Sequence, residues 1–351
     1  MPDRAHLSFA LSLHDAVAPD RTRNAVWSPY SVASALGMVA HAARGETRRE
    51  LDALLGAGNA DLLRDSDVGT VGDDAEFAVA NTLWAWDALP LEDGFLAELA
   101  RWPGGQVRSA PFADDPEGAR KLINADVADT TRGLIPDLLP PGAVKSDTVA
   151  SLVNALYLKC AWNEEFPVHD TTPRPFRGAG EVETMRLEAT LRHGTAPGWE
   201  AVAIPAHGGV EAVVLLPDDV LGDLAGVPAA LESLERHRIE LFLPKLALTV
   251  PTTLGAPLRE VGVRTLFTRD ADLTGLSPDP RLYVDEVLHE AVLRLDEQGF
   301  EGAAATAVMM RLTSIVEHPP ARTVRVDRPH LLLVRHERTG AIYFLAQVVA
   351  P

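Results

Sequence analysis

Apolar positions near the start of the chain follow a helical period. In the run NAVWSPYSVASALGMVAHAARGET, they recur three or four residues apart from Leu36 to Ala43. Ser28 and Pro29 suit the N-cap and first turn of a helix, and we expect Gly45 to end it. A second helical pattern covers residues 117–134.

Strand-like runs dominate the rest of the chain. Apolar segments rich in β-branched and aromatic residues occupy residues 76–86, 149–162 and 241–250, and each predicts one strand. The segment 149–162, VASLVNALYLKCAW, is continuous enough to be a central strand that is buried on both faces.

Two segments predict pairs of strands joined by turns. Residues 202–217 hold two apolar runs around Gly208 and Gly209, and the C-terminal segment 331–351 repeats this pattern around Thr339 and Gly340. Helical patterns therefore come early and strands late. This order favours an α+β fold over alternating βαβ units.

Composition excludes several classes of protein. The 351 residues are 46% hydrophobic and 23% charged, which is enough apolar surface for a buried core and argues against wholesale disorder. The net charge of −18 repels phosphate backbones and anionic lipids, so we expect neither a nucleic acid nor a membrane partner. The N-terminal residues lack the continuous apolar core of a signal peptide, which suggests a cytoplasmic protein or the processed form of a secreted one.

Motifs for catalysis and for cofactor binding are absent. A single cysteine, Cys160, can form neither an internal disulfide nor a thiolate metal cage. His289 and Glu290 begin an HExxH pattern, but Leu293 stands where the second histidine is required. Serines and histidines far apart in sequence could still meet as a triad, although such histidines are more often structural. We expect no enzyme, no metal and no cofactor.

One segment near the C-terminus is unusual for a loop. Residues 293–314 read LRLDEQGFEGAAATAVMMRLTS, and residues 302–310 carry no charge and no proline. As a strand, this segment would place on one face Phe300, Gly302, Ala304, Thr306, Val308 and Met310. An alanine-rich helix or an edge strand is the alternative interpretation.

Taken together, five ordered blocks of the chain resemble the serpin family. They are NAVWSPYSVASALGMVAHAARGET, LVNALYLKCAWNEEF, LFLPKLALTV followed by VGVRTLFTRDADLTGLS, VLHEAVLRLDEQGFEGAAATAV, and VDRPHLLLVRHERTGAIYFLAQVVAP. The resemblance implies an α+β fold of three β-sheets and about nine helices. It also implies one domain over residues 1–351, with an exposed reactive-centre loop and hinge at about 297–320.

The same resemblance implies a function. Inhibitory serpins present this loop to a serine protease as a substrate, then trap the protease covalently as the cut loop inserts into the large sheet. We expect a target serine protease as partner and a monomeric inhibitor. Residues 57–75 form a short connection where some relatives carry a basic helix, so no heparin-type cofactor is expected.

Two positions of the hinge depart from the inhibitory pattern. By resemblance, the hinge comprises Glu297, Gly299, Phe300, Gly302, Ala303, Ala304 and Ala305. Phe300 stands where inhibitory members usually carry Thr or Ser, and Gly302 where they carry Ala. A bulky ring entering the sheet first would slow insertion and favour escape of the protease. A non-inhibitory serpin, acting as a carrier or chaperone, is therefore the alternative function.

Two further groups of residues match regions that control opening of the sheet. The shutter of the family resembles Ser28, Ser31, Asn154 and His289, each of which would otherwise be interpreted as an ordinary buried polar residue. The breach resembles Trp162, Lys245 and Glu297, where an ion pair would hold the hinge. An ordinary surface pair is the alternative for Lys245 and Glu297.

The position of the reactive bond is inferred from the number of residues that separate the hinge from the cut in the family. Counted from Glu297, the bond falls between Thr313 and Ser314, and a register one residue shorter would use Leu312. Thr or Leu suits the primary pockets of chymotrypsin-, elastase- or subtilisin-like proteases, whereas a trypsin-like target would require cleavage after Arg311.

Overall fold

The computed structural model describes most of the chain. The described residues are 4–64, 66, 74–86, 88–102, 105–148, 150–279, 282–284, 287–300 and 321–351. The expected reactive bond and the hinge residues after Phe300 lie outside these ranges. Among the described residues, no helix is both long enough and apolar enough to cross a membrane.

The described residues form eight α-helices, which is compatible with the expected number. They are α1 (Arg4–Val17), α2 (Pro29–Ala42), α3 (Gly45–Leu55), α4 (Asn59–Arg64), α5 (Asp93–Leu99), α6 (Pro116–Thr130), α7 (Val227–Glu232) and α8 (Gly255–Glu260). Three short 3-10 helices, η1 (Val168–Asp170), η2 (His207–Gly209) and η3 (Thr265–Phe267), join other elements. Helices α2 and α6 correspond to the two helical patterns in the sequence, and the other six helices were not predicted.

Two helix ends differ from the sequence-based prediction. Helix α2 ends at Ala42 because Ala43 adopts an extended backbone, and Gly45 begins α3 rather than ending α2. The pattern over 117–134 also predicted too long a helix. Helix α6 stops at Thr130 because Arg132 and Gly133 adopt positive φ angles of 53° and 80°, which turn the chain out of the helix.

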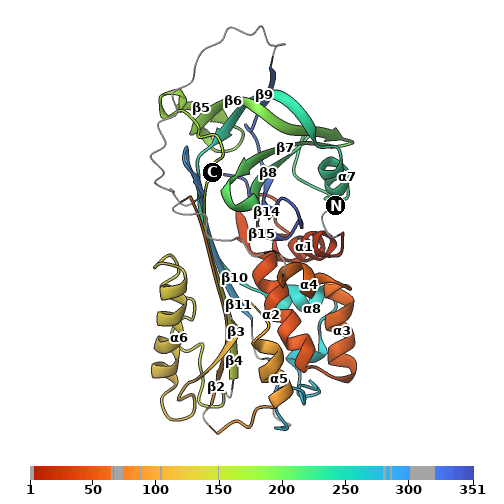
Figure 1. The fold of residues 1–351 in the computed structure, drawn as a ribbon, viewed down its shortest axis with the longest axis vertical. Coiled ribbons are helices and arrows are strands. Elements are labelled where there is room, and N and C mark those ends of the chain that lie inside the picture. The colour runs from red at the N-terminus through yellow and green to blue at the C-terminus, as the bar shows by residue number, and fades with distance from the viewer. Residues whose placement is uncertain are drawn as a thin grey trace.

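A six-stranded sheet forms the centre of the molecule (Figure 1). Its strands lie in the order β10 (Leu246–Thr253), β11 (Leu288–Leu295), β12 (Gly299–Phe300), β4 (Ala150–Ala161), β2 (Ala75–Ala85) and β3 (Gly105–Ser109). Strand β4 lies inside the sheet, which confirms the prediction for residues 149–162. Helix α6 lies on one side of this sheet, and α2 and α5 lie on the other.

The remaining strands form a nine-stranded sheet. Its order is β1 (Ala25–Trp27), β15 (Ile342–Val348), β14 (His330–His336), β8 (Val210–Pro217), β7 (Trp199–Ala206), β6 (Gly180–Ala196), β9 (Glu235–Pro244) and β13 (Arg322–Arg325), with β5 (Thr172–Phe176) also paired to β6. The antiparallel pairs β7–β8 and β14–β15 confirm both predicted hairpins.

Two features of the sheets bear on the sequence-based expectations. Three sheets were expected, and the observed number is roughly compatible: nine strands form one hydrogen-bonded path because the 17-residue strand β6 pairs with β9 along residues 184–193 and with β7 along 192–196. The prediction of one strand over 241–250 was wrong. Strand β9 ends at Pro244 and β10 begins at Leu246, so the chain passes from one sheet to the other at Lys245.

Candidate functional site

The site is an opening between two strands of the six-stranded sheet. Strand β12 is antiparallel to both neighbours, with Phe300 opposite Cys160 of β4 and Leu295 of β11. Strands β4 and β11 are therefore parallel to each other and one strand apart. Beyond β12, no ladder pair joins these two strands within the described residues. We call this interval, between residues 150–158 of β4 and 288–294 of β11, the lane.

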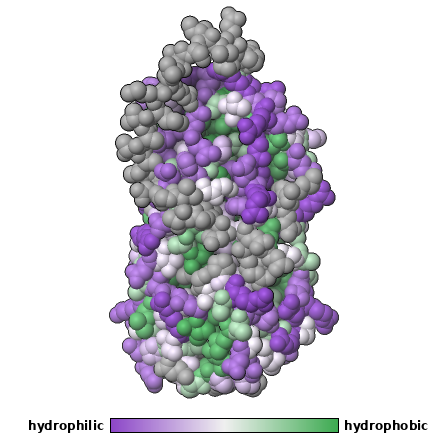
Figure 2. All heavy atoms as spheres, in the orientation of Figure 1, coloured by the Kyte–Doolittle hydropathy of each residue, from purple (hydrophilic) through white to green (hydrophobic). Residues whose placement is uncertain are grey.

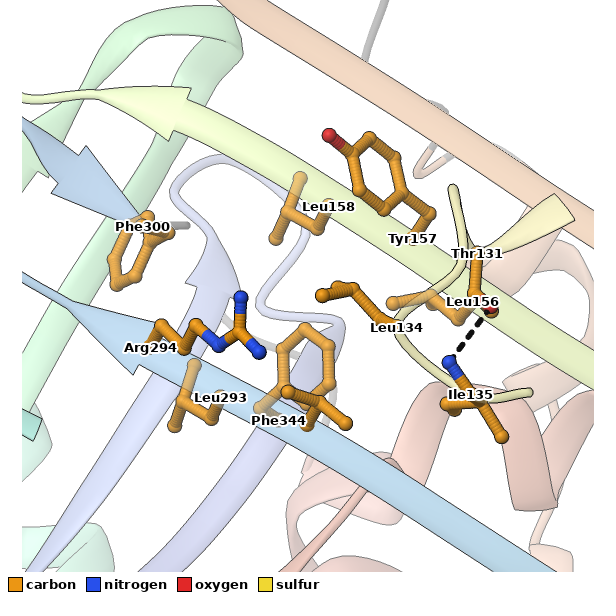
Figure 3. Close-up of a pocket in the computed structure, with 11 residues that line it drawn as sticks. Thr131, Leu134, Ile135, Leu156, Tyr157, Leu158, Leu293, Arg294, Phe300 and Phe344 are labelled. Atoms are coloured by element: carbon orange, nitrogen blue, oxygen red, sulfur yellow. Dashed lines mark hydrogen bonds between the residues drawn. The ribbon is translucent and has the colours of Figure 1, made fainter. Parts of the chain in front are cut away.

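Side chains fill the lane next to β12. Figure 3 shows the ring of Phe300 at one end, with Leu158 and Leu156 along β4 and Leu293 along β11. Thr131, Leu134 and Ile135, from the segment that follows α6, also line this part, and the remaining cavity is only about 10 Å³. The lane near β12 is therefore closed by packing and not by strand pairing.

The other end of the lane is hollow. A cavity of about 260 Å³ lies between α2 and the first residues of β4 and β11, and it is lined mainly by apolar side chains. Ala35 of α2, Leu152 of β4 and Leu288 of β11 are among the residues that line it. Space for additional atoms therefore exists along the direction in which β12 would continue.

Strand β12 requires glycine at its first position. Gly299 has a φ angle of 155°, and a Cβ atom there would lie 2.0 Å from the carbonyl oxygen of Cys160. The next residue, Phe300, is only 2% exposed, and its ring centroid lies 4.7 Å from that of Trp162. The ring that was expected to obstruct insertion is thus already buried between β4 and β11.

Polar contacts hold the chain immediately before β12. Lys245 Nζ lies 2.7 Å from Glu297 Oε2, and Thr171 Oγ1 donates a hydrogen bond of 2.7 Å to Glu297 Oε1. Trp162 Nε1 donates to the carbonyl oxygen of Asp296 at 2.8 Å. Burial alone would raise the pKa of Glu297, but the hydrogen bonds from Lys245 and Thr171 outweigh burial and lower it below its usual value. The structure thus brings together the three residues expected at the breach.

Three of the four expected shutter residues form one hydrogen-bonded group. The backbone N–H of Ser28 donates to His289 Nε2 at 2.9 Å, and the backbone N–H of Ser31 donates to Ser28 Oγ at 3.1 Å. Burial lowers the pKa of His289 to about 4, so this imidazole is neutral at pH 7 and can accept a hydrogen bond. The group ties the start of α2 to β11.

The fourth shutter residue, Asn154, lies on the other side of the lane. Its Nδ2 donates to Asn81 Oδ1 of β2, while its own Oδ1 is buried and has no hydrogen-bond partner among the described residues. Asn154 and His289 are each six positions from the residue that faces Phe300. The two side chains therefore flank the lane at the same level.

Sequence reasoning missed three polar residues that complete these contacts. Asn81 is a buried polar residue within an apolar strand, and that pattern was a usable signal. Thr171 and Asp296 lie in connections, and nothing in their sequence context indicates their partners. Thr313, Ser314, Leu312 and the hinge residues 302–305 lie outside the described residues.

The fold and the lane define an α+β protein whose six-stranded sheet has room for a longer strand between β4 and β11. Comparison with solved structures gives the same architecture: uncleaved ovalbumin matches with a TM-score of 0.82 at 24% identity, covering 99% of each chain. A tumour suppressing serpin matches with a TM-score of 0.83 at 20% identity, covering 99% of this chain and 98% of the other. These matches confirm the serpin fold expected from the sequence.

Sequence comparison identifies the family. The model of the serpin (serine protease inhibitor) family matches residues 4–351, so the chain belongs to the serpins. Leukocyte elastase inhibitor from Bos taurus is 31% identical, covering 92% of this chain and 92% of that protein. Iripin-2 from Ixodes ricinus is 32% identical, covering 98% of this chain and 92% of that protein.

Proposed function

We propose that this protein inhibits serine proteases by suicide covalent trapping. The lane carries the proposal, because it is one strand wide, bounded by two parallel strands and already entered by Phe300 at one end. The chain acts as a single domain and a monomer, with its reactive-centre loop and hinge at 297–320, and needs neither a heparin-type activator nor catalytic activity of its own.

In the proposed reaction, the protease serine attacks the carbonyl carbon of Thr313. The peptide bond to Ser314 breaks, the new amine at Ser314 takes a proton and departs, and Thr313 remains joined to the protease through an ester. Insertion of the freed chain into the lane then moves the attached protease before water can hydrolyse that ester. Trapping succeeds when insertion is faster than hydrolysis.

The register of β12 supports this path. Continued past Phe300, the same ladder would put Ala304 opposite Leu156 and Ala291. It would put Thr306 opposite both Asn154 and His289, where the buried Asn154 Oδ1 has no donor within the described ranges. The hydroxyl of Thr306 can supply that donor. Insertion would thus satisfy a polar atom that has no partner among the described residues of the intact protein.

Insertion also supplies the energy for trapping. A strand of about ten residues that pairs with neighbours on both sides forms a dozen or so ladder bonds, each with a net value of ~1 kcal/mol. On the order of 10 kcal/mol is therefore available to displace and distort the attached protease.

The target class follows from the residue before the cut. Thr313, or Leu312 in the shorter register, suits chymotrypsin-, elastase- or subtilisin-like proteases. The name of the bovine relative supports the elastase-like choice. Cleavage after Arg311 would instead indicate a trypsin-like target.

The test is to mix the protein with chymotrypsin, pancreatic elastase and subtilisin. We expect an SDS-stable complex of one inhibitor and one protease with at least one of them. Mass spectrometry should find a released C-terminal peptide that starts at Ser314, or at Thr313 in the shorter register. Complete cleavage without a complex, for every protease in the panel, would contradict the proposal.

Clean cleavage without trapping would instead support a non-inhibitory serpin that acts as a carrier or chaperone. Phe300 and Gly302, which depart from the inhibitory pattern, favour this alternative. The burial of Phe300 in the intact protein weakens it, because the ring need not enter the sheet during insertion.

A further inference from the structure

Two arginines share one aromatic ring near the strand that follows the reactive-centre loop. The guanidinium carbon of Arg174, on β5, lies 4.1 Å from the ring centroid of Phe242, and that of Arg325, on β13, lies 5.6 Å from it. Phe242 belongs to β9 and faces Arg325 directly across the parallel β9–β13 pair. Both cations are therefore held in place by stacking on the ring.

These two arginines differ from their neighbour in how they are neutralised. Arg186 faces Phe242 from β6 and forms ion pairs with Glu240 at 2.9 Å and Asp170 at 3.2 Å. Within the described residues, neither Arg174 nor Arg325 has a carboxylate within ion-pair distance, and Arg174 Nε is buried without an acceptor. Because Arg174 is half-buried and Arg325 is exposed, their guanidinium groups can still meet a carboxylate from another protein.

The position of the pair relates it to the reactive-centre loop. Strand β13 begins at Arg322, two positions after residue 320, and lies beside β9. In Figure 1, β5, β6 and β9 lie together at one end of the molecule, and the surface there is largely hydrophilic in Figure 2. A protease bound at the reactive bond would be tethered to the chain that leads into this surface.

We infer that Arg174, Phe242 and Arg325 form a docking site for carboxylate groups on the surface of the target protease. The inference rests on the proposed function and adds a second contact outside the reactive bond. Arginine presents a fork of N–H donors that matches a carboxylate, and stacking on Phe242 fixes the fork before binding. Complementary charge on the surfaces of two proteins accelerates their encounter.

A protein carboxylate fits this site better than an extended polyanion. Within the described part of the chain, Arg174 and Arg325 have no carboxylate at ion-pair distance, and Glu240 and Asp170 lie on the same part of the sheet, beside Arg186. A long polyanion would also meet a protein with a net charge of −18. The site suits one or two acidic side chains.

The test compares association rates of the wild type with those of a double variant, Arg174→Gln with Arg325→Gln. With a protease that the wild type traps, we expect association about 5- to 10-fold slower at low ionic strength and nearly equal rates at high salt. The fraction of protease trapped should not change, because the lane is intact. Amidation of the carboxylates of the protease, followed by active-site titration, should remove the difference.

Matched variants separate charge from stacking. Arg259 stacks on Phe267 at 4.3 Å in another part of the molecule, so Arg259→Gln loses an equivalent contact and should associate at the wild-type rate. Arg325→Lys keeps the charge and should stay within about twofold of the wild type. If the double variant is unstable, the single variants Arg174→Gln and Arg325→Gln should each show part of the loss.

Three outcomes would overturn the docking site. One is an unchanged rate in the double variant with every trapped protease, another is an equal loss at high salt, and the third is acceleration by a sulfated polysaccharide that needs both arginines. If the wild type traps no protease, the proposed function fails. In that case, binding to a protease whose catalytic serine is replaced by alanine still tests the docking site, because the double variant must bind more weakly.

Discussion

Phe300 anchors the start of the inserting strand in the lane. Its ring is buried against Trp162, and the glycine before it allows the backbone to approach Cys160 without a clash. The side chain therefore stabilises the intact protein as well as the start of insertion.

We expect Phe300→Ala to destabilise the intact protein by about 3 kcal/mol or more, because it removes a fully buried aromatic ring and leaves a cavity. Unfolding in urea, followed by tryptophan fluorescence, measures this loss. Phe300→Leu keeps most of the volume and should lose far less. Equal stability of the alanine variant and the wild type would show that the ring is not packed as described.

His289 makes the stability of the intact protein depend on pH. Burial lowers its pKa from the usual 6.5 to about 4, so the unfolded chain binds a proton more readily than the folded one. The contribution of neutral His289 to the stability of the folded protein is complete above pH 6.5. It is lost as the pH falls from 6.5 towards 4. Buried His14 and His330, whose pKa values are lowered to about 3 and about 4, act in the same direction.

Replacement of His289 by Gln should therefore weaken the pH dependence. Gln cannot titrate, so the loss of unfolding free energy between pH 6.5 and 4 should shrink by on the order of 3 kcal/mol. Urea unfolding at several pH values measures this change, and the exposed His169→Gln serves as control. A pH profile identical to that of the wild type would mean that His289 is not buried in its neutral form.

Among the elements, the sequence predicts those with local signals. The two hairpins follow from apolar runs around Gly208 and Gly209 and around Thr339 and Gly340. The passage between sheets at Lys245 has no such signal, because residues 241–250 are apolar on both sides of it. The break between β9 and β10 depends on long-range strand pairing, which a local sequence pattern does not contain.

The residues of the site and one of its contacts were predictable, but its other contacts were not. Resemblance identified Lys245 and Glu297, and their ion pair is present, yet the hydrogen bond from Thr171 depends on a segment distant in sequence. The separation of Asn154 from the Ser28–His289 group likewise follows from which strands border the lane. Such contacts appear only when the sheet order is known.

A single charged substitution can test the register of the inserting strand. Ala304→Arg should turn the inhibitor into a substrate, because Arg would be buried opposite Leu156 and Ala291, at a cost of several kcal/mol. The stoichiometry of inhibition should rise from near one to about ten or more. Ala305→Arg, which would face the other side opposite Glu290, is the control and should keep most of the inhibition. Equal effects of both variants would refute the register.

For the whole molecule, trapping by insertion requires that the intact protein is not in its most stable state. Among the residues that the structure describes, the strand between β4 and β11 contains Gly299 and Phe300, and the cavity of about 260 Å³ shows that the lane is incompletely filled. Packing and the contacts around His289 and Glu297 hold this arrangement. Release of the loop by cleavage should complete the sheet.

Thermal unfolding of the cleaved protein shows whether the intact protein is metastable. The loop is cut within residues 311–314 by a protease that is not trapped, and the midpoint is compared with that of the intact protein. A gain on the order of 10 kcal/mol should raise the midpoint by at least about 10 °C, although a covalent bond has been lost. Equal midpoints for the two forms would contradict insertion into the lane and, with it, the trapping mechanism.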